Sequence, residues 1–156
     1  MIRTIAAIDK NRGLAKNGQI PWNLPNDKHR FRDLTLTYGA NVLMGYRTYL
    51  SMGSYLLKRH NFIVSHNNLK LPKDSILVSN LEDFLKSFKN DLWIIGGQSI
   101  YEQTIDLTDE LYLTIIEANF KCDQLFPEYN QFMLVNKEGP FIENNLVYSY
   151  QTFRRL

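Results

Sequence analysis

The sequence is poor in cysteine and has no long apolar run. Its single cysteine, Cys122, has no partner in the chain, so an internal disulfide is excluded. This usage agrees with a reducing compartment. No segment is apolar for long enough to cross a bilayer, and residues 1–7 lack the pattern of a signal peptide. We therefore expect a soluble cytoplasmic protein that does not associate with a membrane.

Strong net charge and metal-binding motifs are also missing. The 156 residues carry a net charge of only +2, which gives no support for a broad basic surface that binds nucleic acid. The three histidines, at positions 29, 60 and 66, show no metal-ligand spacing, and we find no HExxH, CxxC, GxSxG or P-loop motif. We expect no metal and no nucleic-acid partner. The length and the hydrophobic content of 44% suit one globular domain, residues 1–156.

Short apolar runs alternate with helical patterns over most of the chain. Strands are predicted at residues 2–9, 41–44, 61–65, 75–78 and 92–95, and helices at 26–38, 46–52, 81–88 and 99–104. Three further strands, at 110–116, 132–136 and 146–153, follow with little helix between them. This order predicts an α/β fold, with a central, mostly parallel sheet flanked by helices and an antiparallel C-terminal edge. The polar segment 10–19 is predicted to be a loop, of a length that often forms a lid.

The stretch from Ile20 to Asp27 (IPWNLPND) carries the clearest local signal. Two prolines fix its backbone, and Asp27 follows them near the start of the first predicted helix. The face predicted around Asp27 consists of Phe31, Leu34 and Tyr38, and the opposite, charged face of Lys28, Arg30 and Arg32. Desolvation raises the pKa of a carboxyl group on a buried face, as a general acid near neutral pH requires. The alternative is that Asp27 only caps the N–H groups of the first helical turn.

Three predicted strands end in groups that suit an anion. Gly96-Gly97 lies between a buried strand and a helix, where backbone N–H groups point beyond the strand end. The segment Gly45 to Thr48 adds a hydroxyl and a guanidinium, and Ser65-His66 adds a hydroxyl and an imidazole. Because ligands gather at the carboxyl ends of parallel strands, the three together predict a dinucleotide site. The alternative at each position is an ordinary turn.

Arg59 stands just before the strand predicted at 61–65. An arginine can hold a carboxylate through two parallel hydrogen bonds, so Arg59 is a candidate for binding an acidic substrate group. The alternative is a solvated arginine on the surface.

Taken together, these motifs resemble those of the dihydrofolate reductase family, of the single-domain bacterial kind. They follow the family's order and spacing along nearly the whole chain. The matching segments are Ile5-Ala6-Ala7, Pro21-Trp22-Asn23-Leu24-Pro25 with Asp27 and Phe31, Met44-Gly45 with Thr48, Arg59-His60-Asn61, Ile95-Gly96-Gly97 with Tyr101-Glu102-Gln103, Leu111-Tyr112-Leu113-Thr114, and Phe126-Pro127. The resemblance implies a mixed sheet of about eight strands. It also implies a monomer that transfers hydride from NADPH to 7,8-dihydrofolate, and that binds antifolate inhibitors.

The resemblance also implies roles for individual residues. Asp27 holds the pteridine and promotes its protonation, Thr114 orients Asp27, and Trp22 helps to order the water that delivers the proton. The residues implied for substrate binding are Ile5, Ala6, Asp27, Lys28, Phe31, Met52, Leu56, Arg59 and Thr114. Those implied for the cofactor are Ala7, Leu14, Gly45, Tyr46, Arg47, Thr48, Ser65, His66, Ile95, Gly96, Gly97, Gln98, Ser99, Ile100 and Tyr101. Residues 11–24 are expected to close over the reacting rings.

The chain departs from the family's pattern at three places. Tyr46 stands where the family has an arginine, and Arg47 follows it, which bears on the choice between NADPH and NADH. Lys28 replaces an apolar residue after the acid, where it alters the aminobenzoyl wall or meets the glutamate tail of the substrate. Leu14-Ala15 replaces Ile-Gly in the mobile loop, which bears on how the loop closes.

Two other functions fit parts of these patterns. A related reductase that acts on a pyrimidine in riboflavin synthesis has a similar fold, although the stretch from Pro21 to Asp27 speaks against it. A nucleotide-binding module without catalysis would use Asp27 only as a helix cap. Oxidation of NADPH that requires dihydrofolate and is sensitive to methotrexate separates the three functions.

Overall fold

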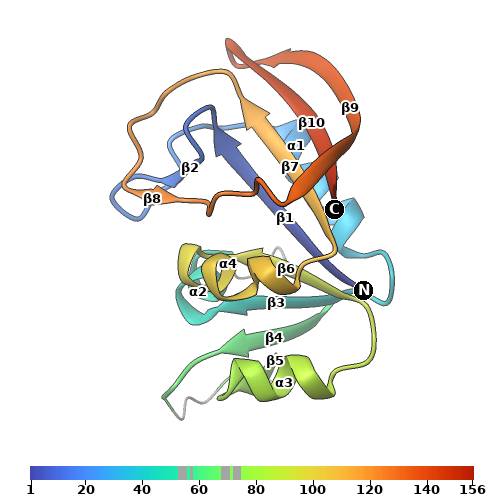
Figure 1. The fold of residues 1–156 in the computed structure, drawn as a ribbon. Helices are drawn as coiled ribbons and strands as arrows, with labels where there is room; N and C mark the ends of the chain where they lie inside the picture. The colour runs from blue at the N-terminus through green and yellow to red at the C-terminus, as the bar shows by residue number, and fades with distance from the viewer. Residues whose placement is uncertain (53–55, 57, 68–70, 72–74) are drawn as a thin grey trace.

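A computed structural model describes residues 1–52, 56, 58–67, 71 and 75–156 of the chain. Its central element is an eight-stranded sheet with the order β5-β4-β3-β6-β1-β7-β10-β9 (Figure 1). The strands are β1 (Ile2–Asp9), β3 (Asn41–Gly45), β4 (His60–Val64), β5 (Ser75–Val78), β6 (Leu92–Gly96), β7 (Glu110–Ile116), β9 (Phe132–Glu143) and β10 (Leu146–Arg155). All pairs from β5 to β7 are parallel, whereas β10 pairs antiparallel with β7 and β9. The predicted α/β fold with an antiparallel C-terminal edge is confirmed.

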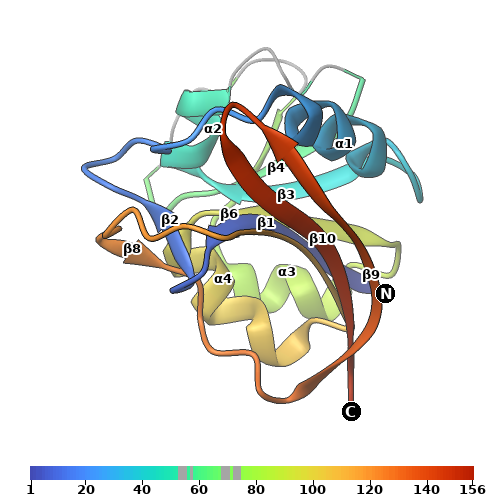
Figure 2. The same cartoon turned by 90° about the horizontal axis from the view of Figure 1, so that it is seen from above.

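Helices cover both faces of this sheet. They are α1 (Pro25–Thr35), α2 (Tyr46–Met52), α3 (Leu81–Ser87) and α4 (Gln98–Thr104), and a 3₁₀ helix follows at Ile105–Leu107. Figure 2 shows α1 and α2 on one side of the sheet and α3 and α4 on the other. Because side chains alternate along a strand, Ile5 of β1 enters the core beneath α1 and α2, whereas Ala6 and Ile8 enter the opposite core. None of the helices in the described ranges is both long enough and apolar enough to span a membrane.

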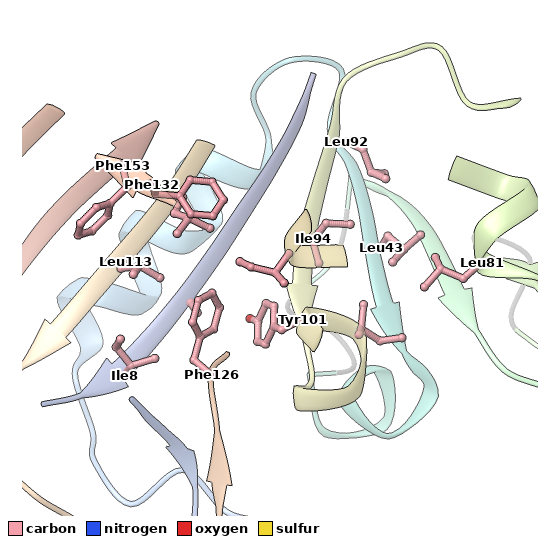
Figure 3. Packing of buried hydrophobic residues seen from close by; sticks show 14 of the residues in the cluster. Ile8, Leu43, Leu81, Leu92, Ile94, Tyr101, Leu113, Phe126, Phe132 and Phe153 are labelled. Atoms are coloured by element: carbon pink, nitrogen blue, oxygen red, sulfur yellow. The ribbon is translucent and has the colours of Figure 1, made fainter. Parts of the chain in front are cut away.

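The larger core lies on the side of α3 and α4 (Figure 3). The rings of Tyr101 and Phe126 pack there with centroids 4.9 Å apart. The hydroxyl of Tyr101 donates to the backbone oxygen of Ile5 at 2.7 Å. Burial raises the pKa of this hydroxyl, so Tyr101 remains a neutral donor. This contact fixes α4 against the middle of the sheet, just after the Gly96-Gly97 turn.

The first helix is shorter than predicted, because α1 ends at Thr35 and not at Tyr38. The Thr35 hydroxyl donates back to the backbone oxygen of Phe31 at 2.7 Å, which competes with continued helix. Positive φ angles at residues 38–40 then turn the chain away from helical geometry. Tyr38 therefore does not share a helix face with Asp27, and that part of the prediction is wrong.

The C-terminal hairpin is longer than predicted. Strand β9 runs on to Glu143 and includes Gly139-Pro140, whereas the predicted strand ended at Asn136. A proline is compatible with β9 because this strand lies at the edge of the sheet, where one row of N–H groups needs no partner strand.

The predicted loop at residues 10–19 contains a short strand, β2 (Gly13–Ala15), that pairs with β8 (Gln124–Leu125). Neither strand was predicted, because segments of two or three residues show no periodicity. The pairing ties this loop to the segment that follows β7.

Candidate active site

Asp27 lies in the first turn of α1 and is directed toward the sheet. The hydroxyl of Thr114, on β7, donates to the Oδ1 atom of Asp27 at 2.5 Å. The capping position of α1 is Leu24, and no side-chain hydrogen bond caps it. The contacts therefore favour the sheet-facing role of Asp27 over the capping role, and they join two of the three residues that we predicted to be catalytic.

Burial dominates the electrostatics of Asp27. It raises the pKa of the carboxyl group and outweighs the hydrogen bond from Thr114 and the charge of Arg30, which both lower that pKa. Glu143, on β9, raises the pKa further by like-charge repulsion. A carboxyl group with a raised pKa retains its proton at higher pH, which suits a general acid.

An apolar cluster lies between the sheet and the helices α1 and α2. It contains the predicted ligand-binding residues Ile5, Phe31, Met52, Leu56 and Ile95. Phe31 follows Asp27 by about one helical turn, so the acid and the apolar cluster share one face of α1. Ala6 differs from the rest of the predicted substrate set, because it packs with the core on the opposite face of the sheet. Ala7 is the register partner of Thr114.

The Gly96-Gly97 turn joins β6 to α4, and there is little room for a side chain at either glycine. A Cβ atom at Gly97 would lie 3.2 Å from Oγ1 of Thr48. Gly96 has a φ of +126°, and a Cβ atom there would lie 3.3 Å from the Tyr101 hydroxyl. The ends of β3 and β6 thus place backbone that carries no side chain beside the Thr48 hydroxyl group. This arrangement fits a dinucleotide cofactor, whose phosphates need close approach to the main chain.

The ends of β3 and β4 lie side by side at the same edge of the sheet. The register pairs Gly45 with Val64, so Tyr46 and Ser65 follow adjacent strand ends. The side chains of Arg47 and His66 are exposed at this edge, and that of Ser65 is half-buried. The residues predicted to bind a phosphate group therefore follow two neighbouring strands.

The other predicted cofactor residues lie around α4. Ile100 is buried in the core on the α4 side, and Leu14 packs against the same core. Gln98 accepts a hydrogen bond from the backbone N–H of Leu125 at 3.3 Å, and Ser99 is exposed. Segment 10–19 thus reaches α4 through the core and through β8.

Arg59 is buried, with only 6% of its surface exposed, so the alternative of a solvated surface arginine is wrong. Its Nη1 atom donates to the hydroxyl of Thr35 at 2.9 Å, at the end of α1. Burial and the nearby charge of Arg32 lower the pKa of Arg59. A buried guanidinium near the end of α1 suits carboxylate binding, and that role remains a prediction.

Trp22 packs against a small core beside β7 and β10. Its ring lies 5.3 Å from that of Phe120, centroid to centroid. Both rings pack against a small core that also contacts Tyr150, the register partner of Thr114 on β10. Through Phe120, Trp22 joins residues 11–24 to the chain after β7, and its role in catalysis remains a prediction.

Sequence reasoning missed Asp9, a buried acid at the end of β1 with 1% exposure. Its carboxylate accepts hydrogen bonds from the backbone N–H groups of Asn11 (2.9 Å), Gly13 (2.8 Å) and Phe120 (3.0 Å). Burial raises the pKa of Asp9, but these bonds outweigh it and lower the pKa. An acid that ends an otherwise apolar run, IRTIAAID, was the available signal.

Arg30 was placed wrongly on the charged outer face of α1. Lys28 and Arg32 are exposed as predicted, but Arg30 is half-buried, with its guanidinium carbon 4.0 Å from the centroid of the Tyr150 ring. The signal was its spacing, because residues i and i+3 share a helix face and Arg30 stands three positions after Asp27.

The comparisons with known proteins agree on one family. The model of the family described as dihydrofolate reductase matches residues 1–155. The dihydrofolate reductase of Bacillus subtilis (strain 168) is 33% identical over 155 residues, which cover 97% of this chain and 91% of that protein. A solved dihydrofolate reductase from Enterococcus faecalis, complexed with NADP(H) and RAB-propyl, superposes with a TM-score of 0.85 at 26% identity, covering 99% of this chain and 96% of that one.

A further relative is a much longer protein. The segregation and condensation protein A of Mycoplasmoides gallisepticum is 37% identical over 141 residues, which cover 86% of this chain. The match takes up only 23% of that protein's length. The similarity therefore concerns one part of that relative.

Proposed function

The chain belongs to the dihydrofolate reductase family, and we propose that it reduces 7,8-dihydrofolate to 5,6,7,8-tetrahydrofolate with NADPH, in support of one-carbon metabolism and thymidylate synthesis. The observation that carries this proposal is the hydrogen bond from Thr114 to Asp27, which presents a carboxyl group of raised pKa beside an apolar cluster. The bare backbone at Gly96-Gly97 supports it from the cofactor side.

Asp27 binds the amino group and the adjacent ring nitrogen of the pteridine through paired hydrogen bonds, and it promotes protonation of that ring. Thr114 holds the orientation of the carboxyl group, and Trp22 orders a water molecule that carries the proton. NADPH, when bound, supplies the hydride. The residues that line the pteridine and the aminobenzoyl group are Ile5, Phe31, Met52 and Leu56, and those that surround the nicotinamide are Ala7, Leu14, Ile95 and Tyr101.

The phosphates of the cofactor are held along the strand ends. Gly96, Gly97 and Thr48 bind the pyrophosphate, whereas Arg47 with Ser65 and His66 binds the 2′-phosphate. Tyr46 carries no positive charge with which to replace the missing arginine, and its ring stacks near that of Tyr49, with centroids 6.5 Å apart. Arg59 binds the α-carboxylate of the glutamate tail.

A spectrophotometric assay tests this function. The purified chain is expected to oxidise NADPH only when dihydrofolate is present, and methotrexate should stop the reaction. The ratio of kcat/KM for NADPH over NADH should fall at least about tenfold in Arg47→Gln, because a charge-assisted contact is lost. Lys86→Gln, on the remote helix α3, should keep the ratio. No dihydrofolate-dependent oxidation would overturn the function, and an unchanged ratio would overturn the role of Arg47.

The same proposal extends to the state of the protein. The chain is a cytoplasmic monomer, forms one domain over residues 1–156, and binds antifolate inhibitors but no nucleic acid. Light scattering should give a mass near the 18.3 kDa of one chain. The two other functions considered from the sequence are not favoured, because the family match covers residues 1–155.

A further inference from the structure

Two residues of α1 dock on two neighbouring residues of the sheet. Asp27 accepts the hydrogen bond from Thr114 on β7, and the guanidinium of Arg30 lies over the ring of Tyr150 on β10. Thr114 and Tyr150 are register partners in the antiparallel pair of β7 and β10. Asp27 and Arg30 stand three positions apart, so they lie on the same face of α1. Thr114 contacts the acid and Tyr150 contacts the arginine, so each of the two α1 side chains has one partner on the sheet.

The guanidinium of Arg30 is not saturated by this arrangement. Its Nη1 atom is buried, and no group in the part of the chain that the structure describes accepts a hydrogen bond from it. A buried donor without a partner is unfavourable unless a ligand or water satisfies it. Burial lowers the pKa of Arg30, but a guanidinium stays protonated in proteins. Arg30 therefore holds a positive charge beside the acid and has an N–H group to offer.

In the described ranges, the other titratable groups that act on this pair are carboxylates and tyrosines. Asp27 faces Glu143 on β9, besides Arg30 on its own helix. The groups that face Arg30 are Asp27, Tyr150 on β10, Glu138 on β9 and Tyr112 on β7. Burial raises the pKa of both tyrosines, so they are neutral near pH 7. Within the described part of the chain, Arg30 is the one positive group that acts on Asp27.

We propose that Arg30 is a positioning residue of the reaction: from its seat on Tyr150 it holds a positive charge beside Asp27, and so sets the pH range over which the acid works. This inference rests on the proposed function, because it assigns Arg30 to the site that Asp27 serves. The unpaired N–H group of Arg30 donates a hydrogen bond to a water molecule or to the bound substrate.

The direction of the effect follows from electrostatics. The charge of Arg30 favours the ionised form of Asp27 and lowers its pKa against the rise caused by burial. Removing that charge should raise the pKa further, so the protonated acid should persist to higher pH. The alkaline fall in turnover should then move to higher pH, a change that a merely structural role would not produce.

The kinetic test compares kcat across pH in three variants of α1. In Arg30→Met, the ratio of kcat at about pH 8.5 to kcat at about pH 6 should rise at least about threefold. Arg30→Lys keeps the charge and should keep a ratio near that of the wild type. Arg32→Gln removes an exposed charge from the same helix and should leave the ratio unchanged. An unchanged ratio in Arg30→Met, or an equal rise in Arg30→Lys, would overturn the proposal.

A second measurement needs no substrate. The ¹³C resonance of the Asp27 carboxyl group, assigned by its absence in Asp27→Asn, can be titrated in the ligand-free protein. Its midpoint should move upward in Arg30→Met and stay in place in Arg32→Gln. A midpoint that does not move refutes the role of Arg30 even if the enzyme is active. If the wild type fails to reduce dihydrofolate, the proposed function fails, and the titration still decides whether Arg30 acts on Asp27.

Discussion

Two arginines, Arg3 on β1 and Arg30 on α1, lie over tyrosine rings, and their surroundings differ. Arg3, near the amino ends of the strands, has its guanidinium carbon 3.5 Å from the centroid of the Tyr38 ring. It also contacts the carboxylates of Glu110 at 3.2 Å and Asp91 at 3.1 Å. Arg30 lies 4.0 Å over Tyr150, but no carboxylate in the described ranges forms a salt bridge with it. Arg3 thus has two carboxylate partners, whereas Arg30 has a ring contact but no carboxylate partner among the described residues.

The difference shows in how each charge is balanced. Burial lowers the pKa of Arg3, but its bond to Asp91 and the nearby negative groups outweigh burial and raise that pKa overall. For Arg30, burial outweighs its neighbours and lowers the pKa. Removing one partner from a matched network leaves a buried charge uncompensated, and such a network has no free polar group to offer to a substrate. A network that leaves a buried polar group without a partner can bind a ligand through that group. We therefore assign a structural role to Arg3 and a functional role to Arg30 with Asp27.

The largest test of this comparison is Asp27→Asn. Turnover at neutral pH should fall by about 10²- to 10⁴-fold, because the group that promotes protonation is lost. The residual rate should climb as pH falls, since solution protons replace the acid. Rates from pH 5 to 9 measure both effects, and a variant with full activity would remove Asp27 from the mechanism.

The same variant should not be less stable. The pKa of Asp27 is raised in the folded protein, so ionisation of this group disfavours folding once pH exceeds the pKa of the unfolded chain. Asn avoids that penalty. Asp27→Asn should therefore gain about 1 kcal/mol of unfolding free energy at pH 7, and the gain should vanish as pH falls below the unfolded pKa. A loss of stability at pH 7 would show that Asp27 is a structural group.

Glu110→Gln should give the opposite result. Glu110 is 8% exposed and accepts contacts from Arg3 (3.2 Å), Arg154 (3.3 Å) and the Tyr112 hydroxyl (3.3 Å). Removing its charge leaves Arg3 short of a partner, which should cost about 3 kcal/mol of unfolding free energy. Urea unfolding measures this, and Glu82→Gln, at an exposed i,i+4 pair on α3, should change it by less than about 1 kcal/mol. A large fall in kcat that the loss of stability does not explain would contradict the structural role assigned to Arg3 and Glu110.

The sequence allowed one side of this comparison to be predicted better than the other. Asp27 follows a proline-rich turn at the start of a helix, and that local pattern predicted an acid beside Phe31. Thr114 is 87 positions away, and no local pattern predicts the hydrogen bond between them, so its role came only from the family resemblance. Arg30 was misassigned because a charged residue in a helix usually faces water, and only tertiary packing on Tyr150 overrides that preference.

Secondary structure followed the same rule. The apolar runs of β1 and β6 were predicted almost to the residue, because strands buried on both faces have a distinctive composition. The end of α1 and the length of β9 were not, since each depends on neighbours. Thr35 bonds back into its own helix, and β10 pairs with β9 from one end to the other, with two register shifts between.

Asp9 tests which property decides the role of a buried acid: the hydrogen bonds that its carboxylate already accepts, or its position at a strand end. It lies at the carboxyl end of β1, as a functional group would, but its carboxylate is filled by backbone N–H bonds. Asp9→Asn should lose about 1–2 kcal/mol of unfolding free energy at pH 7. Because the folded pKa of Asp9 is lowered, this contribution is present above the unfolded pKa and lost as pH falls through the folded pKa. The gap between variant and wild type should therefore close in acid, and a gap that is independent of pH would contradict the assignment.

The smallest expected effects separate the two tyrosines. Tyr38→Leu and Tyr150→Leu each remove a ring from beneath a guanidinium, so each should lose about 0.5–1 kcal/mol of stability beyond the lost packing. Only Tyr150→Leu should also change the pH dependence of kcat, because only there does the ring hold a charge that acts on the catalytic acid. Arg3 is already fixed by Glu110 and Asp91, so losing Tyr38 should leave that dependence unchanged. If both variants shift the profile alike, or neither does, the distinction between a matched and an incomplete arginine has no functional meaning.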